Sequence, residues 1–307
     1  MISEKIVVGE KYPLDGLITL PATGAGPYPA VVLVHGSGAS DMDENIYAVR
    51  PFKDIAEGLA QLGIACIRYN KRSFSYGKQM VEDAGKALTV QEEVVEDAIY
   101  AADLLRQDPR IDPDKIFIAG HSLGGMLAPR IDATGGNFAG LIILAGSPRR
   151  LEEIMKEQQM ATLDTLKGPL KWIGKKQIAK IQEKLDSIYT KTDEEAQAIP
   201  FAGGTTIYYL KEMGQKTAAE YLAESNKPIF VLHPEKDVQV SLEKDFQKYK
   251  EILAGRTNAS FQLYPGLNHA FMPSLYGTIN KALKEFQTKQ HVDVQVIADI
   301  ADWIHSL

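Results

Sequence analysis

The chain has 307 residues, of which 45% are hydrophobic and 24% are charged, and its formal net charge is −6. These are ordinary values for a globular protein, and the length suffices for one large α/β domain with an insertion or for two small domains. The negative charge argues against nucleic acid as a main partner, because phosphate binding needs a basic surface.

Signals for a membrane or for export are not expected. No stretch approaches the ~20 consecutive apolar residues of a transmembrane helix. The opening residues, "MISEKIVVGEKYPLDG", show no basic segment followed by a long apolar run. Cys66 is the only cysteine, and its apolar surroundings, "GIACI", predict a buried structural thiol and no internal disulfide. We therefore expect a cytoplasmic protein that has no membrane contact.

The first part of the chain predicts strands and helices in alternation. Two short strands at the N-terminus form an expected antiparallel edge, and "YPAVVLVHG" has the continuous apolar character of a strand buried on both faces. The helix that follows ends at Gly63, and the next one has apolar residues at helical spacing and ends before Pro109. The predicted strands cover residues 4–10, 14–22, 28–36 and 64–70, and the helices cover 49–63 and 89–108.

The second part repeats the alternation around one interruption. Strands are predicted over 114–122, 138–146, 227–235 and 260–266, and helices start at 123, near 240 and in the region that runs to Leu307. Between 148 and 224 the chain is polar and helical, and its lysines alternate with glutamates as on the solvated face of a helix. The order predicts a doubly wound, mostly parallel sheet from residues 1–147 and 225–307, with a helical cap insertion over 148–224.

The sequence "GHSLGG" over residues 120–125 contains a candidate nucleophile. The pattern G-x-S-x-G arises by chance in roughly one chain of this length in ten. Here it lies between a predicted strand and a predicted helix, which is the context of a nucleophile elbow. Gly120 and Gly124 let the strand and the helix approach closely around the turn, and His121 lies inside the motif. We expect Ser122 to be the nucleophile.

A serine nucleophile needs a base, and the base needs a carboxylate. Of the six histidines, His269 in "YPGLNHAF" lies in the loop after the last strand, where a base can meet Ser122. Asp237 follows the preceding strand in "IFVLHPEKDVQV", and Glu235 is the alternative carboxylate. We expect the residue order Ser122, Asp237, His269 along the chain.

Two more features of the candidate site follow other strand ends. The glycine-flanked turn in "VVLVHGSGASD" suggests the backbone N–H of Ser37 as an oxyanion donor, with the N–H of Leu123 as the second; which N–H of residues 35–38 serves is left open. Lys71 and Arg72 follow another strand and are candidates for the substrate entrance. Solvation at the protein surface is the favoured interpretation of both.

These motifs, in this order, resemble the α/β-hydrolase family, and in particular bacterial serine carboxylesterases related to dienelactone hydrolases and carrying a helical cap. Further matching stretches are "HGSGASDMDEN", "IRYNKRSFSYGK", "GSPRRLEEIMKEQQ" and "YYLKEMGQKTAAEYLAESNKPIFVLHPEKDVQV". The sequence departs from that group at Asn70, where an aspartate is expected, and at Ser73, where a glycine is usual. It lacks the cysteine nucleophile of dienelactone hydrolases proper.

The resemblance and the residues together predict a carboxylic ester hydrolase for small to medium acyl esters, acting through a Ser–His–Asp triad and an acyl-enzyme, without metal or cofactor. One alternative is a serine aminopeptidase or acyl-peptide hydrolase-like enzyme with the same triad, and another is a non-catalytic ligand-binding member of the fold. A lipase is less expected because the cap region is charged. The sequence leaves the acyl preference and the oligomeric state open.

Overall fold

A computed structural model describes residues 1–24 and 26–307. Its centre is an eight-stranded sheet in the order β1–β2–β4–β3–β5–β6–β7–β8, in which β1 and β2 are antiparallel to their neighbours and the other strands are parallel. This confirms the predicted doubly wound, mostly parallel sheet. The strands are β1 (Ile2–Val8), β2 (Leu14–Leu20), β3 (Tyr28–Val34), β4 (Ala65–Tyr69), β5 (Ile111–His121), β6 (Leu141–Leu144), β7 (Ile229–Pro234) and β8 (Ala259–Tyr264).

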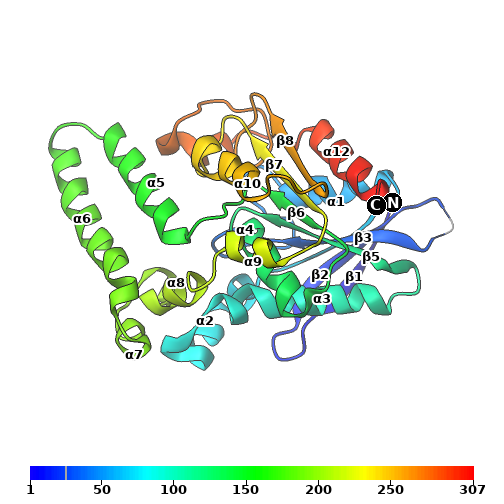
Figure 1. Ribbon diagram of the computed structural model, residues 1–307, viewed down its shortest axis with the longest axis horizontal. Helices are drawn as coiled ribbons and strands as arrows, with labels where there is room; N and C mark the ends of the chain where they lie inside the picture. Colours follow the sequence, from blue (N-terminus) through cyan, green and yellow to red (C-terminus); the bar gives the residue numbers. More distant parts are fainter. Residues whose placement is uncertain (25) are drawn as a thin grey trace.

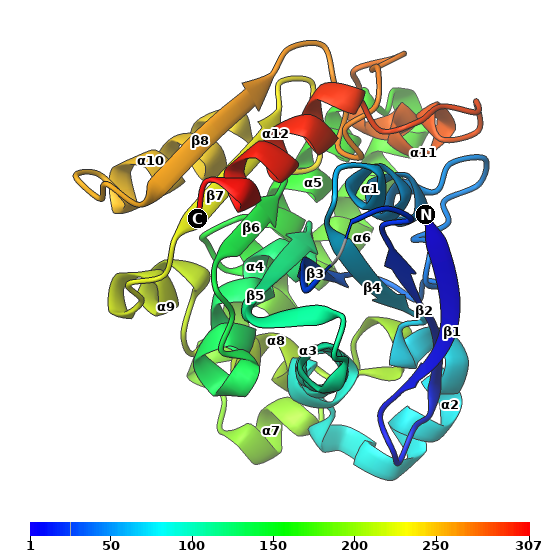
Figure 2. The ribbon, with the colours of Figure 1, turned by 90° about the vertical axis from the view of Figure 1, so that its right-hand side faces the viewer.

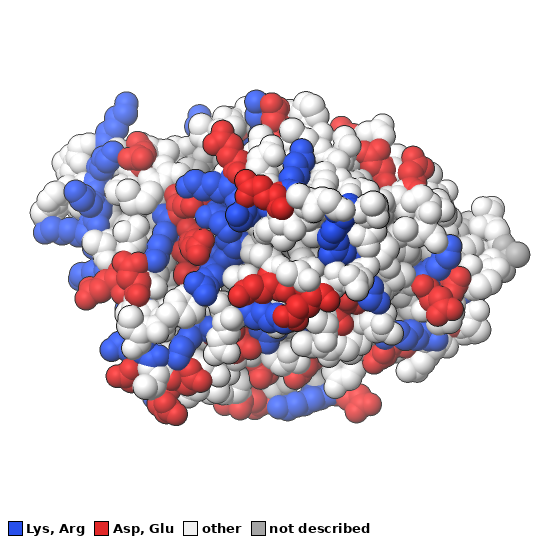
Figure 3. Space-filling view, in the orientation of Figure 1, with Lys and Arg blue, Asp and Glu red and all other residues white. Residues whose placement is uncertain are grey.

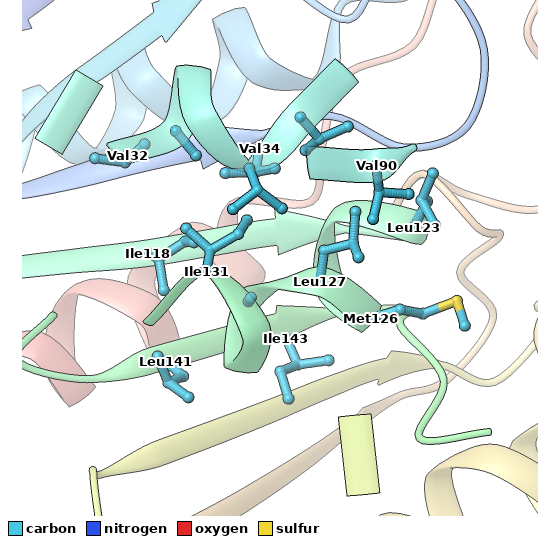
Figure 4. Close-up of a cluster of buried hydrophobic side chains, with 14 of the residues drawn as sticks. Val32, Val34, Val90, Ile118, Leu123, Met126, Leu127, Ile131, Leu141 and Ile143 are labelled. Atoms are coloured by element: carbon cyan, nitrogen blue, oxygen red, sulfur yellow. The ribbon is translucent and has the colours of Figure 1, made fainter. Parts of the chain in front are cut away.

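Alternate residues of the central strands face two separate apolar cores. In β3, Val31 and Leu33 pack into the core beneath α1 (Pro51–Gln61) and α12 (Val294–His305). Val32 and Val34 point to the opposite face and join the core beneath α3 (Glu96–Gln107) and α4 (Leu123–Ile131). Figure 2 shows α1 and α12 on one side of the sheet and α3 and α4 on the other. In Figure 4 the side chains of Val32 and Val34 lie close to those of α4.

The helices between β6 and β7 lie where the insertion was predicted. They are α5 (Leu151–Thr165), α6 (Gly168–Ser187), α7 (Asp193–Gln197), α8 (Ile207–Met213) and α9 (Ala218–Glu224), with short 3-10 turns at Ile188–Thr190 and Ala202–Gly204. Figure 1 shows α5 to α8 at the left end of the molecule, beyond the sheet, whereas α9 lies beside α4. We call α5 to α8 the cap.

The lysines of the cap are mostly exposed. Blue side chains gather at the left of Figure 3, over α6, with acidic side chains between them. Lys156 is paired with Asp186 at 2.6 Å, and Lys171 with Asp164 at 3.1 Å. The outer face of the cap therefore carries charges of both signs.

The remaining elements surround the carboxyl ends of the strands. They are α2 (Arg72–Ala84), the turn Gly85–Ala87, η2 (Gln91–Val95), which continues into α3, a π-turn at Asp132–Gly136, η6 (Leu242–Phe246), α10 (Gln247–Ile252), η7 (Ile279–Lys281) and α11 (Ala282–Glu285). The helix predicted to start near residue 240 starts at Leu242. The Ser241 hydroxyl caps it by accepting the N–H of Lys244.

Three further properties of the described part of the chain concern its cysteine, membrane-spanning helices and metal sites. Cys66 is buried in β4, and burial raises the pKa of its thiol to about 12. Within residues 1–24 and 26–307, no helix has the length and apolarity to span a bilayer, and no group of three or more His, Cys, Asp or Glu side chains is arranged to hold a metal ion.

Candidate active site

Ser122 occupies a strained turn between β5 and α4. Its φ of 53° is in the left-handed region, which residues other than glycine seldom adopt. The turn is tight because its glycines have no side chain. A Cβ on Gly120 would overlap the carbonyl of Gly124, and a Cβ on Gly124 would overlap the carbonyl of Val34. The local geometry is that of the predicted nucleophile elbow.

Asp237 and His269 form a direct hydrogen bond. The Nδ1 of His269 lies 2.7 Å from Oδ2 of Asp237, whose side chain is fully buried. The other oxygen, Oδ1, accepts the N–H groups of Gln239 and Val240 at 2.7 and 3.0 Å. Burial alone would raise the pKa of Asp237, but the charge and hydrogen bond of His269 outweigh it and lower that pKa. The carboxylate is thus fixed in position and ionised.

Glu235, the alternative carboxylate, points elsewhere. Its side chain is exposed, and its Oε2 accepts the N–H of Gly266 at 3.1 Å and lies 3.4 Å from the ammonium of Lys236. The geometry therefore favours Asp237 as the partner of His269.

The loop that carries His269 is held by its neighbour Asn268. The side-chain oxygen of Asn268 accepts the N–H groups of Ala270 and Met272 at 3.1 and 3.3 Å, and its amide nitrogen donates to Glu285 at 2.8 Å. The backbone N–H of Lys236 also donates to the carbonyl of Leu267. These bonds join the His269 loop to the Asp237 loop, so that the two residues are positioned together.

His121, the residue before Ser122, connects the turn that holds Ser122 to the loop of His269. The ring Nε2 of His121 is 3.0 Å from the carbonyl oxygen of His269, and the two rings are 4.8 Å apart. Among the described residues, the Ser122 hydroxyl forms no hydrogen bond with Nε2 of His269. In free enzymes such bonds are often long and tighten only when substrate binds.

His121 takes part in an ion pair that the sequence analysis did not find. Its Nε2 must carry a hydrogen because the His269 carbonyl can only accept, and its Nδ1 lies 3.0 Å from Oε1 of Glu44. Burial lowers the pKa of His121, but the Glu44 charge outweighs this and raises it; burial raises the pKa of Glu44, but His121 lowers it overall. The pair is therefore a buried imidazolium and carboxylate. Glu44 lies in "HGSGASDMDEN", in which no spacing rule singles it out.

The loop after β3 approaches the elbow closely. A Cβ on Gly36 would lie 3.2 Å from Cβ of Ser122, and the N–H of Gly36 donates to Oε1 of Glu44 at 3.0 Å. The first N–H groups of a helix have no acceptor within that helix, which leaves the N–H of Leu123 at the start of α4 free to bind a ligand. Ser37 and Leu123, the two predicted oxyanion donors, line one cavity.

This cavity, of about 380 Å³, lies between the core and the cap. Its volume is within the range of small-molecule sites. Its apolar wall comes from α2, the start of α4, the cap and the segment before η2, and consists of Met80, Val81, Leu88, Leu123, Leu151, Met155, Phe201 and Leu210. The sequence of the cap is rich in charged residues, but the cap residues that line the cavity are mostly apolar.

The predicted surface solvation of Lys71 and Arg72 is wrong, because both side chains are buried. Lys71 lines the cavity. Arg72 does not line it: its guanidinium pairs with Asp97 and Glu96, at 2.5 and 2.9 Å. The sequence could not reveal this difference, since the partners come from η2 and α3, some 20 residues further along the chain.

The two positions at which the sequence departs from the related esterases also lie beside the site. The side-chain oxygen of Asn70 accepts the N–H of Met42 at 2.9 Å and so helps to hold the loop after β3. Ser73 lines the cavity at the start of α2. Neither residue contacts the Asp237–His269 pair.

Comparison with known proteins assigns the chain to a family. Residues 31–276 match the family model described as "Alpha/beta hydrolase family", which covers most of the chain. The chain belongs to the alpha/beta hydrolase family. The chain is also 36% identical over 293 residues to Esterase EstD of Thermotoga maritima, an alignment that covers 95% of this chain and 65% of that protein. It thus spans just under two thirds of the length of this relative.

Solved structures of other proteins share the fold. Proline iminopeptidase from Mycobacterium smegmatis superimposes with a TM-score of 0.60 at 13% identity, over 99% of this chain and 98% of its own. Est1E from Butyrivibrio proteoclasticus gives 0.59 at 15% identity, over 98% of each chain. At such identities the similarity establishes the fold alone.

Proposed function

We propose that the protein is a serine carboxylesterase that hydrolyses small to medium acyl esters. The observation that carries the proposal is the 2.7 Å bond between His269 Nδ1 and Asp237, next to the strained turn that holds Ser122. The 36% identity to a protein named an esterase supports the same reaction.

Each residue has a defined role in the proposed reaction. The Ser122 hydroxyl attacks the ester carbonyl while Nε2 of His269 accepts its proton, and Asp237 stabilises the imidazolium that forms. The N–H groups of Ser37 and Leu123 stabilise the oxyanion. The alcohol leaves with the proton from His269, and an acyl group remains on Ser122. Water, deprotonated by His269, then attacks this acyl-enzyme and releases the acid.

The cavity supports an acyl group of limited size. Its volume of about 380 Å³ corresponds to roughly a dozen water-sized volumes, and its wall is mostly apolar. An aliphatic or small aromatic acyl chain would bury its surface there when its carbonyl lies at Ser37 and Leu123.

The electrostatics of the cavity favour an ester over an aminopeptidase substrate. An aminopeptidase needs a free carboxylate for the substrate ammonium. Glu93 is the acidic residue that lines the cavity, and its two oxygens already bind Lys71 and the hydroxyl of Tyr209, at 3.0 and 2.6 Å. A non-catalytic binding role is less favoured, since it would not require the ordered Asp237–His269 pair. A cytoplasmic location stays a prediction of the sequence.

The test combines covalent labelling with turnover. We expect a small fluorophosphonate to label the wild type and Ser260→Ala, which removes an exposed serine of β8, but not Ser122→Ala. p-Nitrophenyl esters of graded acyl length should be hydrolysed by the same two labelled proteins. A Ser122→Ala variant that retains labelling and turnover would reject Ser122 as the nucleophile, and a wild type that hydrolyses amides faster than esters would favour the peptidase.

A further inference from the structure

The ammonium of Lys71 binds the backbone of the loop after β3. Its Nζ donates to the carbonyl oxygens of Gly36 and Gly38, at 3.0 and 3.1 Å, and lies 3.0 Å from Oε1 of Glu93. An ammonium has three N–H donors, so these three acceptors use all of them. The side chain is only 3% exposed, and the cation is therefore shielded from water.

These bonds bear directly on the N–H of Ser37. The carbonyl of Gly36 and the N–H of Ser37 belong to one planar trans peptide, in which they point in opposite directions. When Lys71 holds the Gly36 carbonyl, the N–H of Ser37 must point away from Lys71. The N–H of Gly36, on the preceding peptide, is held separately by Glu44 at 3.0 Å.

Packing restrains this loop little beyond Gly36, so hydrogen bonds decide its conformation there. Gly38 has a φ of 90°, and no atom lies within 4 Å of the position that a Cβ would take. Without Lys71, the peptides on either side of Ser37 could rotate, since glycines flank that residue. The backbone bond from the N–H of Lys71 to the carbonyl of Ser40 lies further along the loop and does not orient the Ser37 peptide.

The same cation is connected to the cap. Oε2 of Glu93 accepts the hydroxyl of Tyr209 at 2.6 Å, and Tyr209 belongs to α8 of the cap. Burial raises the pKa of Glu93, but the Lys71 charge outweighs it and lowers that pKa, which keeps the carboxylate ionised. A continuous set of contacts thus runs from α8 through Glu93 and Lys71 to the carbonyls of Gly36 and Gly38.

We propose that Lys71 is the positioning residue of the oxyanion hole, and that Tyr209 and Glu93 make its position depend on the cap. This inference rests on the proposed esterase function, in which the N–H of Ser37 stabilises the oxyanion. Lys71 forms no bond to the substrate; it acts through the peptide of Gly36 and Ser37. A cap that lies against the core orients Lys71, and Lys71 in turn orients the oxyanion donor.

The experiment compares three changes in the full chain. Lys71→Met with Glu93→Gln removes both charges together and avoids leaving one of them buried alone. Tyr209→Phe removes only the link to the cap. Arg130→Met is the matched control, because Arg130 is another buried cation that pairs with a cap carboxylate, Glu212, at 2.7 Å, without touching the loop.

Three readouts separate positioning from folding. For p-nitrophenyl butyrate we expect the double variant to lose about 10² in kcat, as when an oxyanion donor is removed, with KM within about threefold. Tyr209→Phe should lose less, about threefold to tenfold in kcat. The affinity for a trifluoromethyl ketone, which mimics the tetrahedral intermediate, should fall in parallel with kcat/KM. Amide hydrogen exchange of residues 36–40 should become faster in the double variant and not in Arg130→Met.

The outcomes distinguish this inference from the function on which it rests. A wild type without ester turnover would reject the proposed function, and the inference with it. An active wild type whose double variant keeps the wild-type kcat and the wild-type exchange rates over residues 36–40 would overturn only the role of Lys71. An equal loss of kcat in Arg130→Met would attribute the effect to cap stability in general and would also overturn it.

Discussion

At the scale of single residues, the candidate site depends on two buried pairs of a carboxylate and a histidine. Asp237 binds His269, and Glu44 binds His121, whose ring also donates to the carbonyl of His269. The first pair is the expected orienting bond of a serine hydrolase. The second lies under it and ties the elbow, the loop after β3 and the His269 loop together.

Replacing Asp237 by Asn should abolish most turnover without unfolding the protein. The amide cannot stabilise the imidazolium and favours the wrong tautomer of His269, so we expect kcat for p-nitrophenyl acetate to fall by about 10³ to 10⁴. Glu235→Gln is the control, since that side chain is exposed and binds Gly266. A larger loss in Glu235→Gln than in Asp237→Asn would reverse the assignment of the carboxylate.

The Glu44–His121 pair should make stability depend on pH in a defined direction. The raised pKa of His121 stabilises the folded state at pH values below the ordinary histidine pKa of 6.5. This stabilisation is lost as the pH rises through the raised pKa. The lowered pKa of Glu44 stabilises the folded state above the ordinary pKa of 4.5, and this stabilisation is lost as the pH falls through the lowered pKa. The pair therefore contributes most between these two values.

We expect Glu44→Gln to lower the free energy of unfolding by roughly 3 kcal/mol near pH 5.5, because it leaves His121 without its counter-charge. The difference from the wild type should be smaller at pH 9 than at pH 5.5, because the attraction between the two groups is lost as the pH rises through the raised pKa of His121. Urea unfolding of both proteins at pH 5.5 and at pH 9 measures this difference in the free energy of unfolding. A difference that grows with pH would show that His121 is neutral in the folded protein.

At the scale of elements, the site consists of loops at the carboxyl ends of parallel strands. Five strands, β3, β4, β5, β7 and β8, each end shortly before a residue of the candidate site. This is why a linear reading of strands and turns could place Ser122, Asp237 and His269 at the same edge of the sheet. The sequence could not give the contacts of Lys71 or Glu44, because no periodicity links residues of different loops. The helix start at Leu242 also depends on a single capping hydroxyl.

The turn at Ser122 should not tolerate any side chain at Gly124. A methyl group there would overlap the carbonyls of Val34 and His35, and backbone atoms cannot move aside cheaply. We expect Gly124→Ala to lower the free energy of unfolding by about 3 kcal/mol or more. Gly77→Ala in α2, where a Cβ meets open space, should change it by less than about 1 kcal/mol. Equal stabilities of the two variants in urea would contradict the observed packing of the elbow.

At the scale of the whole molecule, the cap forms part of the wall of the cavity proposed to bind the acyl group. Composition indicates that residues 148–224 are helical and charged, but it cannot say which side chains turn inward, because the cap helices have weakly separated apolar faces. The core was easier to predict, since its strands are continuous apolar runs. The division of the chain into core and cap at 148 and 224 stays a prediction.

Filling the cavity from the cap should shorten the preferred acyl chain. Met155 of α5 lines the cavity, whereas Met160 of the same helix is 44% exposed. We expect Met155→Trp to lower kcat/KM for p-nitrophenyl octanoate by about tenfold or more and to leave the acetate ester within about threefold. Met160→Trp should leave the chain-length profile unchanged. An unaltered profile in Met155→Trp would mean that the acyl group binds outside this cavity.

The lone cysteine has a practical consequence for studies of the cap. Cys66 is inaccessible inside β4, and the raised pKa of its thiol keeps it protonated and unreactive towards alkylating reagents at neutral pH. The native chain therefore provides a silent background for site-specific spectroscopy. Cysteines introduced on the outer face of α6 and on the exposed face of the core would accept a donor and an acceptor dye, and energy transfer between them would report the distance between cap and core during turnover.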